Sequence, residues 1–399
     1  MLFPSLRIDL KGEREVQNSR ILFITDKYLP FPSSNGACIS RIVNSYENKE
    51  NIFVISFSEE ANENTSNVYY CRYKRKPSSF FNRLFGYCQD NGAVNALFGE
   101  ANRLVEENNI NKVVCVYRSI ECLLAGLKLK MKHRDLCVIG YFLDNIFEWS
   151  TSSKLKDQIF YINQKRLLNQ LNHYFDSIIA LKYYKPTIEK LLTRSKKVDY
   201  VGLPSLQDRK IESSLFNKSN INIVYAGSFY SNCRRPDEIL EFLNCVRKQL
   251  PKLKIYLFSW GCEDLIDAAK EKMGDCLEVC GRVSLEEADR AIQSADILLN
   301  VGNDLPYAIP GKLIEYFSTG KSIINFSYRH GDGAAADCEK YENIFNVYAN
   351  SENNVDDCVR FILNRHTLPW DVLNKKFYDS TPEYTAAKIL ETGLNKNNV

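Results

Sequence analysis

Short runs of apolar, often β-branched residues alternate along the chain with longer segments in which apolar residues recur every three or four positions. The short runs predict strands, and the longer segments predict helices that bury one face. Near-continuous apolar strands separated by helices are typical of a parallel sheet that helices cover on both sides. In the first half the predicted strands are Ile21–Thr25, Ile52–Phe57, Val113–Tyr117, Cys137–Phe142, Ile178–Leu181 and Val198–Val201, and the predicted helices include Ala37–Tyr46 and Ala93–Glu107.

The same alternation restarts after residue 220. Its predicted strands are Asn222–Ala226, Lys254–Phe258, Leu277–Cys280, Ile297–Val301 and Ser322–Phe326, and its helices are Pro236–Leu250, Leu265–Lys272, Leu285–Ser294 and Gly311–Thr319. We therefore predict an α/β protein of two Rossmann-like, doubly wound parallel-sheet domains that face each other across a cleft. The domains span residues 1–202 and 221–380, with a polar linker over 203–220 and a C-terminal helix and tail over 381–399.

Composition narrows the class of protein. Of the 399 residues, 45% are hydrophobic and 25% are charged, which excludes a disordered or fibrous chain. The net charge is only +3, so no overall basic field attracts nucleic acid. The 13 cysteines include no CxxC pair and only four histidines are present, so we expect no metal site. The N-terminal segment is charged where a signal peptide would be apolar, and no apolar run is long enough to span a membrane. We therefore expect a cytoplasmic protein.

Two strand-to-helix loops carry features suited to an anion. The first follows the strand that ends at Thr25 and reaches Gly36, where a helix begins and free N–H groups favour phosphate. The second follows Gly227 and presents Arg234 and Arg235 just before a helix that starts with proline. The alternative for the first loop is that it needs glycine only for its backbone conformation. The alternative for the second loop is that both arginines are solvated surface side chains.

A third loop follows the buried strand Ile297–Val301 and leads to the short helix Gly311–Thr319. Lys312 and Glu315 lie three residues apart on one polar face of this helix. The start of the helix suits a phosphate, and a carboxylate one turn later suits the hydroxyls of a ribose. The alternative is a surface ion pair between the two side chains, which contributes little.

Together these segments resemble the GT-B glycosyltransferases, in particular the group-1 set known as family 4. The resemblance is carried by the runs GRVSLEEADRAIQSADILLNVGN and PGKLIEYFSTGKSII, and more weakly by FITDKYLPFPSSNGA. It implies transfer of a sugar from a nucleotide-sugar donor, with the donor mostly on the C-terminal domain and the acceptor on the N-terminal one. It also implies retention of configuration and a reaction that needs neither a metal nor a cofactor.

The resemblance assigns roles residue by residue. Glu315 is the carboxylate expected on the ribose. Where the family often carries a further glutamate, separated from this one by seven residues, this chain has Tyr307. The residues expected to bind the donor are Gly36, Gly227, Arg235, Asn303, Gly311 and Glu315, and Arg234 and Lys312 are expected to act on the leaving diphosphate.

On the N-terminal side, Asp144 comes just after the predicted strand Cys137–Phe142. A carboxylate at the carboxyl end of a sheet can act in catalysis or bind an acceptor. Glu148 and Arg118 are weaker candidates for the same role. A loop aspartate that caps the next turn is the alternative.

Residues 65–89 contain no acidic residue and interleave basic with aromatic side chains. This composition predicts contact with an anionic membrane surface, which would suit a glycan or lipid-linked acceptor. A loop with half-buried aromatics is the alternative. Nucleic-acid binding is disfavoured because the chain is nearly neutral.

Three functions remain open from the sequence. The leading one is a glycosyltransferase of surface polysaccharide or glycolipid synthesis, at the inner face of the cell membrane. A nucleotide-sugar epimerase of the same fold is the second, with His330 as the histidine nearest to the donor loops. A non-catalytic partner subunit is the third, suggested by Tyr307.

Overall fold

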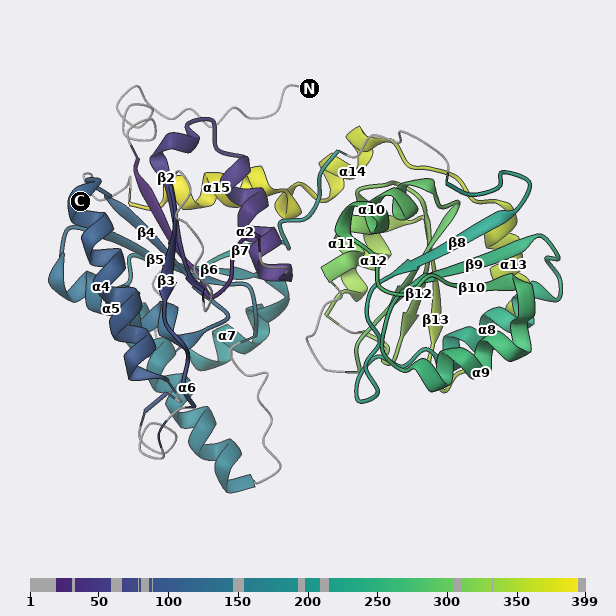
Figure 1. The fold of residues 1–399 in the computed structure, drawn as a ribbon, viewed down its shortest axis with the longest axis horizontal. Coiled ribbons are helices and arrows are strands. Elements are labelled where there is room, and N and C mark those ends of the chain that lie inside the picture. Colours follow the sequence, from purple (N-terminus) through teal and green to yellow (C-terminus); the bar gives the residue numbers. More distant parts are fainter. Residues whose placement is uncertain are drawn as a thin grey trace. The chain divides into compact units, whose positions relative to one another are not determined.

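The computed structural model describes residues 19–30, 33–58, 67–77, 79, 86–87, 89–145, 154–192, 198–208, 215–304, 311–331 and 333–393. The chain forms two compact units. Unit 1 comprises Met1–Pro204 with Asp379–Val399, and unit 2 comprises Ser205–Tyr378. Each unit is a parallel sheet with helices on both faces, as Figure 1 shows, which confirms the predicted fold class.

Unit 1 contains a seven-stranded sheet in the order β3-β2-β1-β4-β5-β6-β7. Its strands are β1 (Ile21–Ile24), β2 (Ile52–Ser58), β3 (Val68–Arg72), β4 (Lys112–Tyr117), β5 (Cys137–Phe142), β6 (Ser177–Leu181) and β7 (Val198–Val201). Every residue of β1, β2 and β4 is buried, because helices cover both faces of the sheet.

The helices of unit 1 are α2 (Ser34–Asn44), α4 (Asn91–Glu107), α5 (Ile120–Lys132), α6 (Lys154–Tyr174), α7 (Lys185–Leu191) and α15 (Pro382–Glu391). Figure 1 shows α4 and α5 on one side of the sheet and α2 with α15 on the other. Side-chain caps fix helix starts in this unit, including those of α2 and α4. Ser33 Oγ accepts from Gly36 N at 2.9 Å before α2, and Asp90 Oδ1 accepts from Gly92 N at 3.0 Å before α4.

Unit 2 contains a six-stranded sheet in the order β10-β9-β8-β11-β12-β13. Its strands are β8 (Ile221–Ala226), β9 (Leu253–Phe258), β10 (Leu277–Val279), β11 (Ile297–Val301), β12 (Ser322–Ser327) and β13 (Ile344–Tyr348). Its helices are α8 (Asp237–Arg247), α9 (Glu263–Met273), α10 (Leu285–Ser294), α11 (Gly311–Phe317), α12 (Ala335–Tyr341), α13 (Val355–Leu363) and α14 (Trp370–Lys376). The helix α8 packs against α9 and α13 on one face of the sheet (Figure 1).

Both sheets reverse their strand order in the middle. In unit 1 the order runs from β1 to β3 in one direction and from β4 to β7 in the other. In unit 2 the same reversal separates β8 from β11. The loops that leave two such neighbouring strands diverge to opposite faces, so ligands of open α/β sheets bind at the carboxyl ends beside this switch point.

All the strands predicted from the sequence are present, within one residue at either end. Two further strands, β3 and β13, were not predicted. Both are edge strands whose residues are mostly half-buried, although the other two edge strands, β7 and β10, were predicted.

The chain passes from one unit to the other after Pro204 and again after Tyr378. In unit 1 the two connecting segments lie side by side, since Gly202 N donates to Asp379 O at 2.7 Å. A Cβ at Gly202 would lie 2.0 Å from Ser380 Oγ, so only glycine permits this approach. The helix α15 then packs against α2 and β7, and the C-terminal segment is part of unit 1.

A buried lysine anchors α15. Lys112 begins β4, and its Nζ donates to the carbonyl oxygens of Ile389 and Leu390 at 2.8 Å each. These carbonyls belong to the last turn of α15, where helical partners are lacking. Burial lowers the pKa of Lys112 to about 8, because the low-polarity surroundings disfavour its charge.

We expect this lysine to give the protein a measurable pH dependence of stability. Between pH 8 and the ordinary lysine value of 10.5, the unfolded chain holds a proton that the folded chain lacks, so stability rises with pH. The free energy of unfolding of the wild type minus that of Lys112→Met should therefore increase by about 3 kcal/mol across this window. Urea unfolding of both proteins at pH 7, 8.5 and 10.5 measures the difference, and a constant difference would contradict the assignment.

Candidate functional site

The switch point of unit 2 holds an arginine in a defined position. Arg234 Nε donates to Asn303 Oδ1 at 3.0 Å, and Nη1 donates to Ser228 O at 3.4 Å. Ser228 follows β8 and Asn303 follows β11, so the arginine bridges the two loops that leave the switch point. Paired backbone hydrogen bonds of 2.9 Å between Tyr230 and Arg234 close the turn that carries the arginine.

Two buried tyrosines brace this turn. Tyr316 Oη on α11 accepts from Ala226 N at 3.1 Å and so ties that helix to the end of β8. Tyr225 Oη donates to Ser228 O at 3.0 Å, and burial raises the pKa of Tyr225 to about 12, so the hydroxyl stays protonated. A Cβ at Gly227 would lie 3.0 Å from this hydroxyl, which gives the glycine a packing role.

Lys312 and Glu315 form an ion pair on α11, with Nζ donating to Oε2 at 2.7 Å. The Glu315 side chain is only 10% exposed, whereas that of Lys312 is 38% exposed. The carboxylate is therefore held within the unit and the ammonium lies near its surface, unlike the two solvated groups of an ordinary surface pair. Gly311 has space around it, since a Cβ there would meet no other atom within 4 Å.

Arg235 has a different environment from its neighbour. Its guanidinium donates from Nε and Nη2 to the Asp237 carboxylate at 3.1 and 2.8 Å, and this pairing raises the pKa of Arg235. Its peptide N–H donates to Tyr328 Oη at 2.6 Å. The charge of Arg235 is thus neutralised at the start of α8, whereas Arg234 has no ion-pair partner in the described part of the chain.

An exposed tryptophan lies at the same carboxyl edge of the sheet. Trp260 follows β9 and is 44% exposed, and the Arg282 guanidinium lies 5.0 Å from the centre of its ring. Phe229 N donates to Trp260 O at 2.9 Å, and a Cβ at Gly261 would lie 2.4 Å from Phe229 O. The sequence analysis did not select this pair, although a tryptophan directly after an apolar strand is a signal that could have been used.

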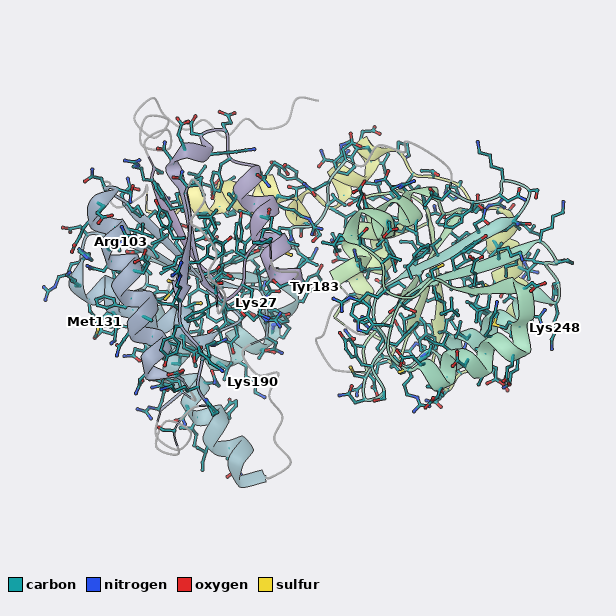
Figure 2. All side chains as sticks on the ribbon, viewed as in Figure 1. Lys27, Arg103, Met131, Tyr183, Lys190 and Lys248 are labelled. Atoms are coloured by element: carbon teal, nitrogen blue, oxygen red, sulfur yellow. The ribbon has the colours of Figure 1, made fainter. Side chains whose placement is uncertain are left out.

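The switch point of unit 1 brings three charged side chains together. Asp26 follows β1, Arg118 follows β4 and Asp144 follows β5, and these are neighbouring strands. Arg118 Nε lies 3.4 Å from Asp26 Oδ2. Asn35, at the start of α2, donates from Nδ2 to Asp144 Oδ2 at 3.0 Å. Figure 2 labels Lys27, which marks the loop after β1.

Asp26 is the most buried member of this cluster. Its side chain is 7% exposed, and Oδ1 has no hydrogen-bond partner among the described residues. Burial raises the pKa of Asp26, and the nearby Asp144 charge adds to this rise, while Arg118, Arg75 and the backbone N–H of Lys27 oppose it. Burial also raises the pKa of Asp144, against the hydrogen bond from Asn35 and the charge of Arg118.

The structure brings some of the residues predicted for unit 1 together, and others lie outside the described residues. Asp144 and Arg118 lie in one cluster with Asp26, which follows β1 and was not among the predicted residues. Its signal was its place as the first charged residue after the first strand. A Cβ at Gly36 would lie 2.8 Å from Ser33 Oγ and 3.2 Å from Lys27 O, so this glycine lets α2 begin close to the loop. Glu148 and Tyr307 lie outside the described residues.

Part of the basic and aromatic stretch 65–89 is engaged within unit 1. Arg75 pairs with the buried Glu121 at 2.5 Å, and Tyr73 Oη donates to Asp90 Oδ1 at 3.2 Å. Tyr87 Oη donates to the side chain of Gln170 at 2.9 Å. Within the described part of the stretch 65–89, the exposed basic residues are Arg72, Lys74, Arg75 and Lys76.

No group of three or more His, Cys, Asp or Glu side chains in the described part of the chain could hold a metal ion. No helix of the same residues has the length and apolar character needed to cross a membrane. His330 stacks on the ring of Tyr348 with 3.9 Å between centroids, at the end of β13.

Comparison with known proteins identifies the fold. No family model matches the chain, and no curated protein matches it in sequence. Among solved structures it is similar to the lipopolysaccharide outer core galactosyltransferase WaaB in its apo form, at 14% identity over 93% of this chain and 98% of that one, with a TM-score of 0.58. Sucrose-phosphate synthase from Thermosynechococcus elongatus gives 12% identity, 95% and 96% coverage and a TM-score of 0.58.

A Listeria monocytogenes protein assigned as a UDP-N-acetylglucosamine 2-epimerase is also similar, at 10% identity over 93% of this chain and 94% of that one, with a TM-score of 0.56. At these identities the likeness shows the fold and no more. The chain has the fold of the GT-B glycosyltransferases, built from two parallel-sheet α/β units.

The cluster in unit 1 predicts an unusual effect on stability. Asp26→Asn should leave the free energy of unfolding at pH 7 within about 1 kcal/mol of the wild type or above it, because the ion pair with exposed Arg118 contributes little. The raised pKa of Asp26 means that the folded protein binds the proton more readily, so this group's contribution to stability is largest in acid and is lost as pH rises. The free energy of unfolding of the wild type should therefore rise relative to that of Asp26→Asn as the pH is lowered.

Asp176→Asn is the matched control for this measurement. Asp176 is also 7% exposed, but its Oδ2 accepts from Lys130 Nζ and from Val138 N at 2.8 Å each. Removing one partner of a buried pair should destabilise the protein by about 3 kcal/mol or more. Urea unfolding of the three proteins from pH 4 to pH 7 makes the comparison. Equal destabilisation by both substitutions would show that Asp26 has a purely structural role.

Proposed function

We propose that the protein is a glycosyltransferase that moves a sugar from a nucleotide-sugar donor to a hydroxyl acceptor. The single observation that carries the proposal is Arg234. It is positioned by Asn303 and Ser228 O at the switch point of unit 2, and it has no ion-pair partner in the described part of the chain. An uncompensated guanidinium at this place suits a diphosphate.

The chemistry of the reaction requires such a cation. When the bond between the sugar and the diphosphate breaks, negative charge develops on the departing oxygens. A guanidinium already held in place stabilises that charge without having to reorganise. In this proposal Arg234 contacts the diphosphate, and the surface ammonium of Lys312 supplements it.

The remaining parts of the donor have candidate partners in unit 2. The buried Glu315 carboxylate suits the ribose hydroxyls, since a carboxylate accepts two hydrogen bonds. The exposed ring of Trp260, with Arg282 over its face, suits a stacked nucleobase. Gly36, Gly227, Asn303 and Gly311 are proposed to line the donor path, and Arg235 is the weakest member because Asp237 neutralises it.

The acceptor is proposed to be a glycan or a lipid-linked glycan at the cytoplasmic face of the membrane, with retention of configuration as the family resemblance implies. WaaB, one of the similar structures, is by name a galactosyltransferase of the lipopolysaccharide outer core. Exposed Arg72, Lys74 and Lys76 could supply the contact with an anionic surface. Proton NMR of the product glycoside distinguishes retention from inversion.

A nucleotide-sugar epimerase is the second candidate, because one similar structure is assigned that activity. An epimerase needs acid and base groups around the donor sugar. His330 stacks on Tyr348 at the end of β13, an edge strand that β12 separates from β11. Incubation with the donor alone separates the functions, since only an epimerase interconverts sugars without an acceptor.

The two adjacent arginines provide a matched test of diphosphate binding. In a thermal-shift panel of UDP, GDP, ADP and CMP, a nucleotide present at about 100 times its dissociation constant should add about 2.7 kcal/mol to stability. Arg234→Gln should weaken binding of the best nucleoside diphosphate about tenfold or more, because a charged hydrogen bond is lost. Arg235→Gln should leave binding within about twofold, since Asp237 already neutralises that residue.

Calorimetric titration of the wild type and both variants makes the measurement. The parent nucleoside should bind all three proteins alike, because it carries no phosphate. Equal losses for Arg234→Gln and Arg235→Gln, or no nucleotide binding by the wild type, would remove the basis of the proposal.

Glu315→Gln tests the ribose contact separately. The substitution keeps the shape of the side chain but converts one acceptor oxygen into a donor. Affinity for the nucleoside diphosphate should fall about tenfold, and the preference for ribose over 2′-deoxyribose should disappear. If the variant still discriminates between the two sugars as the wild type does, Glu315 does not contact the ribose. Lys312→Gln is the comparison: it removes the ion pair and the ammonium proposed at the diphosphate, but it should leave the preference for ribose over 2′-deoxyribose unchanged.

A further inference from the structure

The turn that carries Arg234 has little packing of its own. Residues 230–235 lie between β8 and α8, and none of them is buried. Apolar contacts therefore contribute little to fixing this turn, and its position depends on hydrogen bonds to neighbouring segments. A cation that stabilises a leaving group must be held in place beforehand, so the groups that make these hydrogen bonds matter for function.

The first part of the turn is held by the loops after β8 and β9. Phe229 N donates to Trp260 O at 2.9 Å, and Tyr230 and Arg234 exchange backbone hydrogen bonds of 2.9 Å. The Arg234 guanidinium also lies 5.9 Å from the centre of the Tyr230 ring. These contacts close the turn on itself. They do not involve the peptide groups of Arg235, where the chain continues towards α8.

Tyr328, which directly follows β12, holds that end of the turn. Its hydroxyl accepts from Arg235 N at 2.6 Å and donates to Arg235 O at 2.9 Å. Burial raises the pKa of Tyr328, so the hydroxyl stays protonated and can donate. The half-buried ring packs edge-on against Phe326 of β12, with 5.1 Å between centroids. The place of the hydroxyl is therefore set by β12 and not by the turn.

A second contact from the loop after β12 reaches the partner of Arg234. Arg329 donates from Nε and Nη2 to Asp304 Oδ1 at 3.1 and 3.0 Å, and Asp304 N donates to Cys233 O at 2.7 Å. Asp304 directly follows Asn303, whose Oδ1 accepts from Arg234 Nε. The loop after β12 thus contacts both the arginine turn and the loop that leaves β11.

Of these two contacts, the tyrosine is the stronger constraint on the turn. Arg329 and Asp304 are both about half exposed, so solvent weakens their attraction. The Tyr328 hydroxyl, in contrast, bonds to the backbone itself from a ring that packing keeps in place. Loss of this hydroxyl would leave both peptide groups of Arg235 to water, and the turn could then move away from Asn303.

We propose that Tyr328 is a positioning residue for Arg234, whose guanidinium it keeps in place for the diphosphate before the donor binds. The inference rests on the proposed function, since it takes the diphosphate as the ligand of Arg234. Tyr328 does not contact the donor in this proposal and acts through the backbone of Arg235. Its effect on binding should therefore vanish where Arg234 is absent.

Hydrogen exchange of the full-length protein without nucleotide tests the structural part of the proposal. Tyr328→Phe keeps the ring and its contact with Phe326, but Arg235 N–H loses its acceptor. Exchange of the amides of residues 231–235, followed by mass spectrometry, should be about fivefold faster than in the wild type. Tyr341→Phe is the matched control, because the Tyr341 hydroxyl donates to Lys321 O at 2.7 Å, away from the turn. Its exchange at 231–235 should match the wild type.

Calorimetric titration tests the functional part. The probe is the nucleoside diphosphate that the wild type binds best among UDP, GDP and ADP. Tyr328→Phe should weaken its binding about fivefold and leave binding of the parent nucleoside unchanged. In the Arg234→Gln background the same substitution should have no further effect, because both changes act through one guanidinium. Tyr341→Phe should bind the probe as the wild type does.

Three results would overturn the proposal. They are unchanged exchange at 231–235 in Tyr328→Phe, unchanged affinity despite faster exchange, and an equal loss of affinity with and without Arg234. In the last case Tyr328 would act on the nucleotide by another route. Tyr328→Phe changes one oxygen on a half-buried ring, so its free energy of unfolding should lie within about 1.5 kcal/mol of the wild type. Urea unfolding checks that the variant is folded.

Failure of the proposed function would give a different result. If the wild type binds no nucleoside diphosphate, the transferase assignment falls and the role of Tyr328 falls with it. If nucleotides bind in an Arg234-dependent way but Tyr328→Phe binds them as the wild type does, the transferase assignment stands and the positioning role is wrong.

Discussion

The reversal of strand order in each sheet decides where polar groups can gather in this protein. Strands such as β2 and β4 are buried on both faces, so charged side chains stand at their ends. Beside the reversal the two outgoing loops diverge to opposite faces, and the strand ends remain open to a ligand. Asp26 and Arg118 occupy this position in unit 1, and Arg234 and Asn303 occupy it in unit 2.

The buried carboxylates at the switch point of unit 1 lower the stability of the fold, and packing elsewhere in the protein offsets this loss. Asp26 is buried with one unpaired oxygen among the described residues, and both it and Asp144 have raised pKa values because burial disfavours their charge. Contacts elsewhere supply the rigidity, such as Tyr316 bonded to the end of β8 and Lys112 bonded to the last turn of α15. Carboxylates held in an unfavourable state are expected where a site serves binding at the expense of stability.

The sequence predicted the architecture because central parallel strands have unbroken apolar runs, and each of these was recognised. It missed the edge strands β3 and β13, whose residues are mostly half-buried, although it found β7 and β10, the other two edge strands. Among the candidate residues, sequence position placed Arg234, Arg235, Asp144 and Arg118 at strand ends. It did not separate Arg234 from Arg235, because the distinction depends on side-chain partners, namely Asn303 for one and Asp237 for the other. Asp26 was missed for a related reason, since burial of a loop aspartate is invisible in the chain.

The two switch points have opposite electrostatic character, and this difference bears on how the reaction could be divided. In unit 2 the guanidinium of Arg234 has no carboxylate partner in the described part of the chain, so that site favours an anion. In unit 1 the carboxylates of Asp26 and Asp144 lie near Arg118, so that site disfavours an anion. A nucleotide sugar carries its charge on the diphosphate, whereas an accepting sugar is neutral. Under the proposed function the diphosphate would therefore be favoured in unit 2 and disfavoured in unit 1, so charge would direct the donor before any close contact is made.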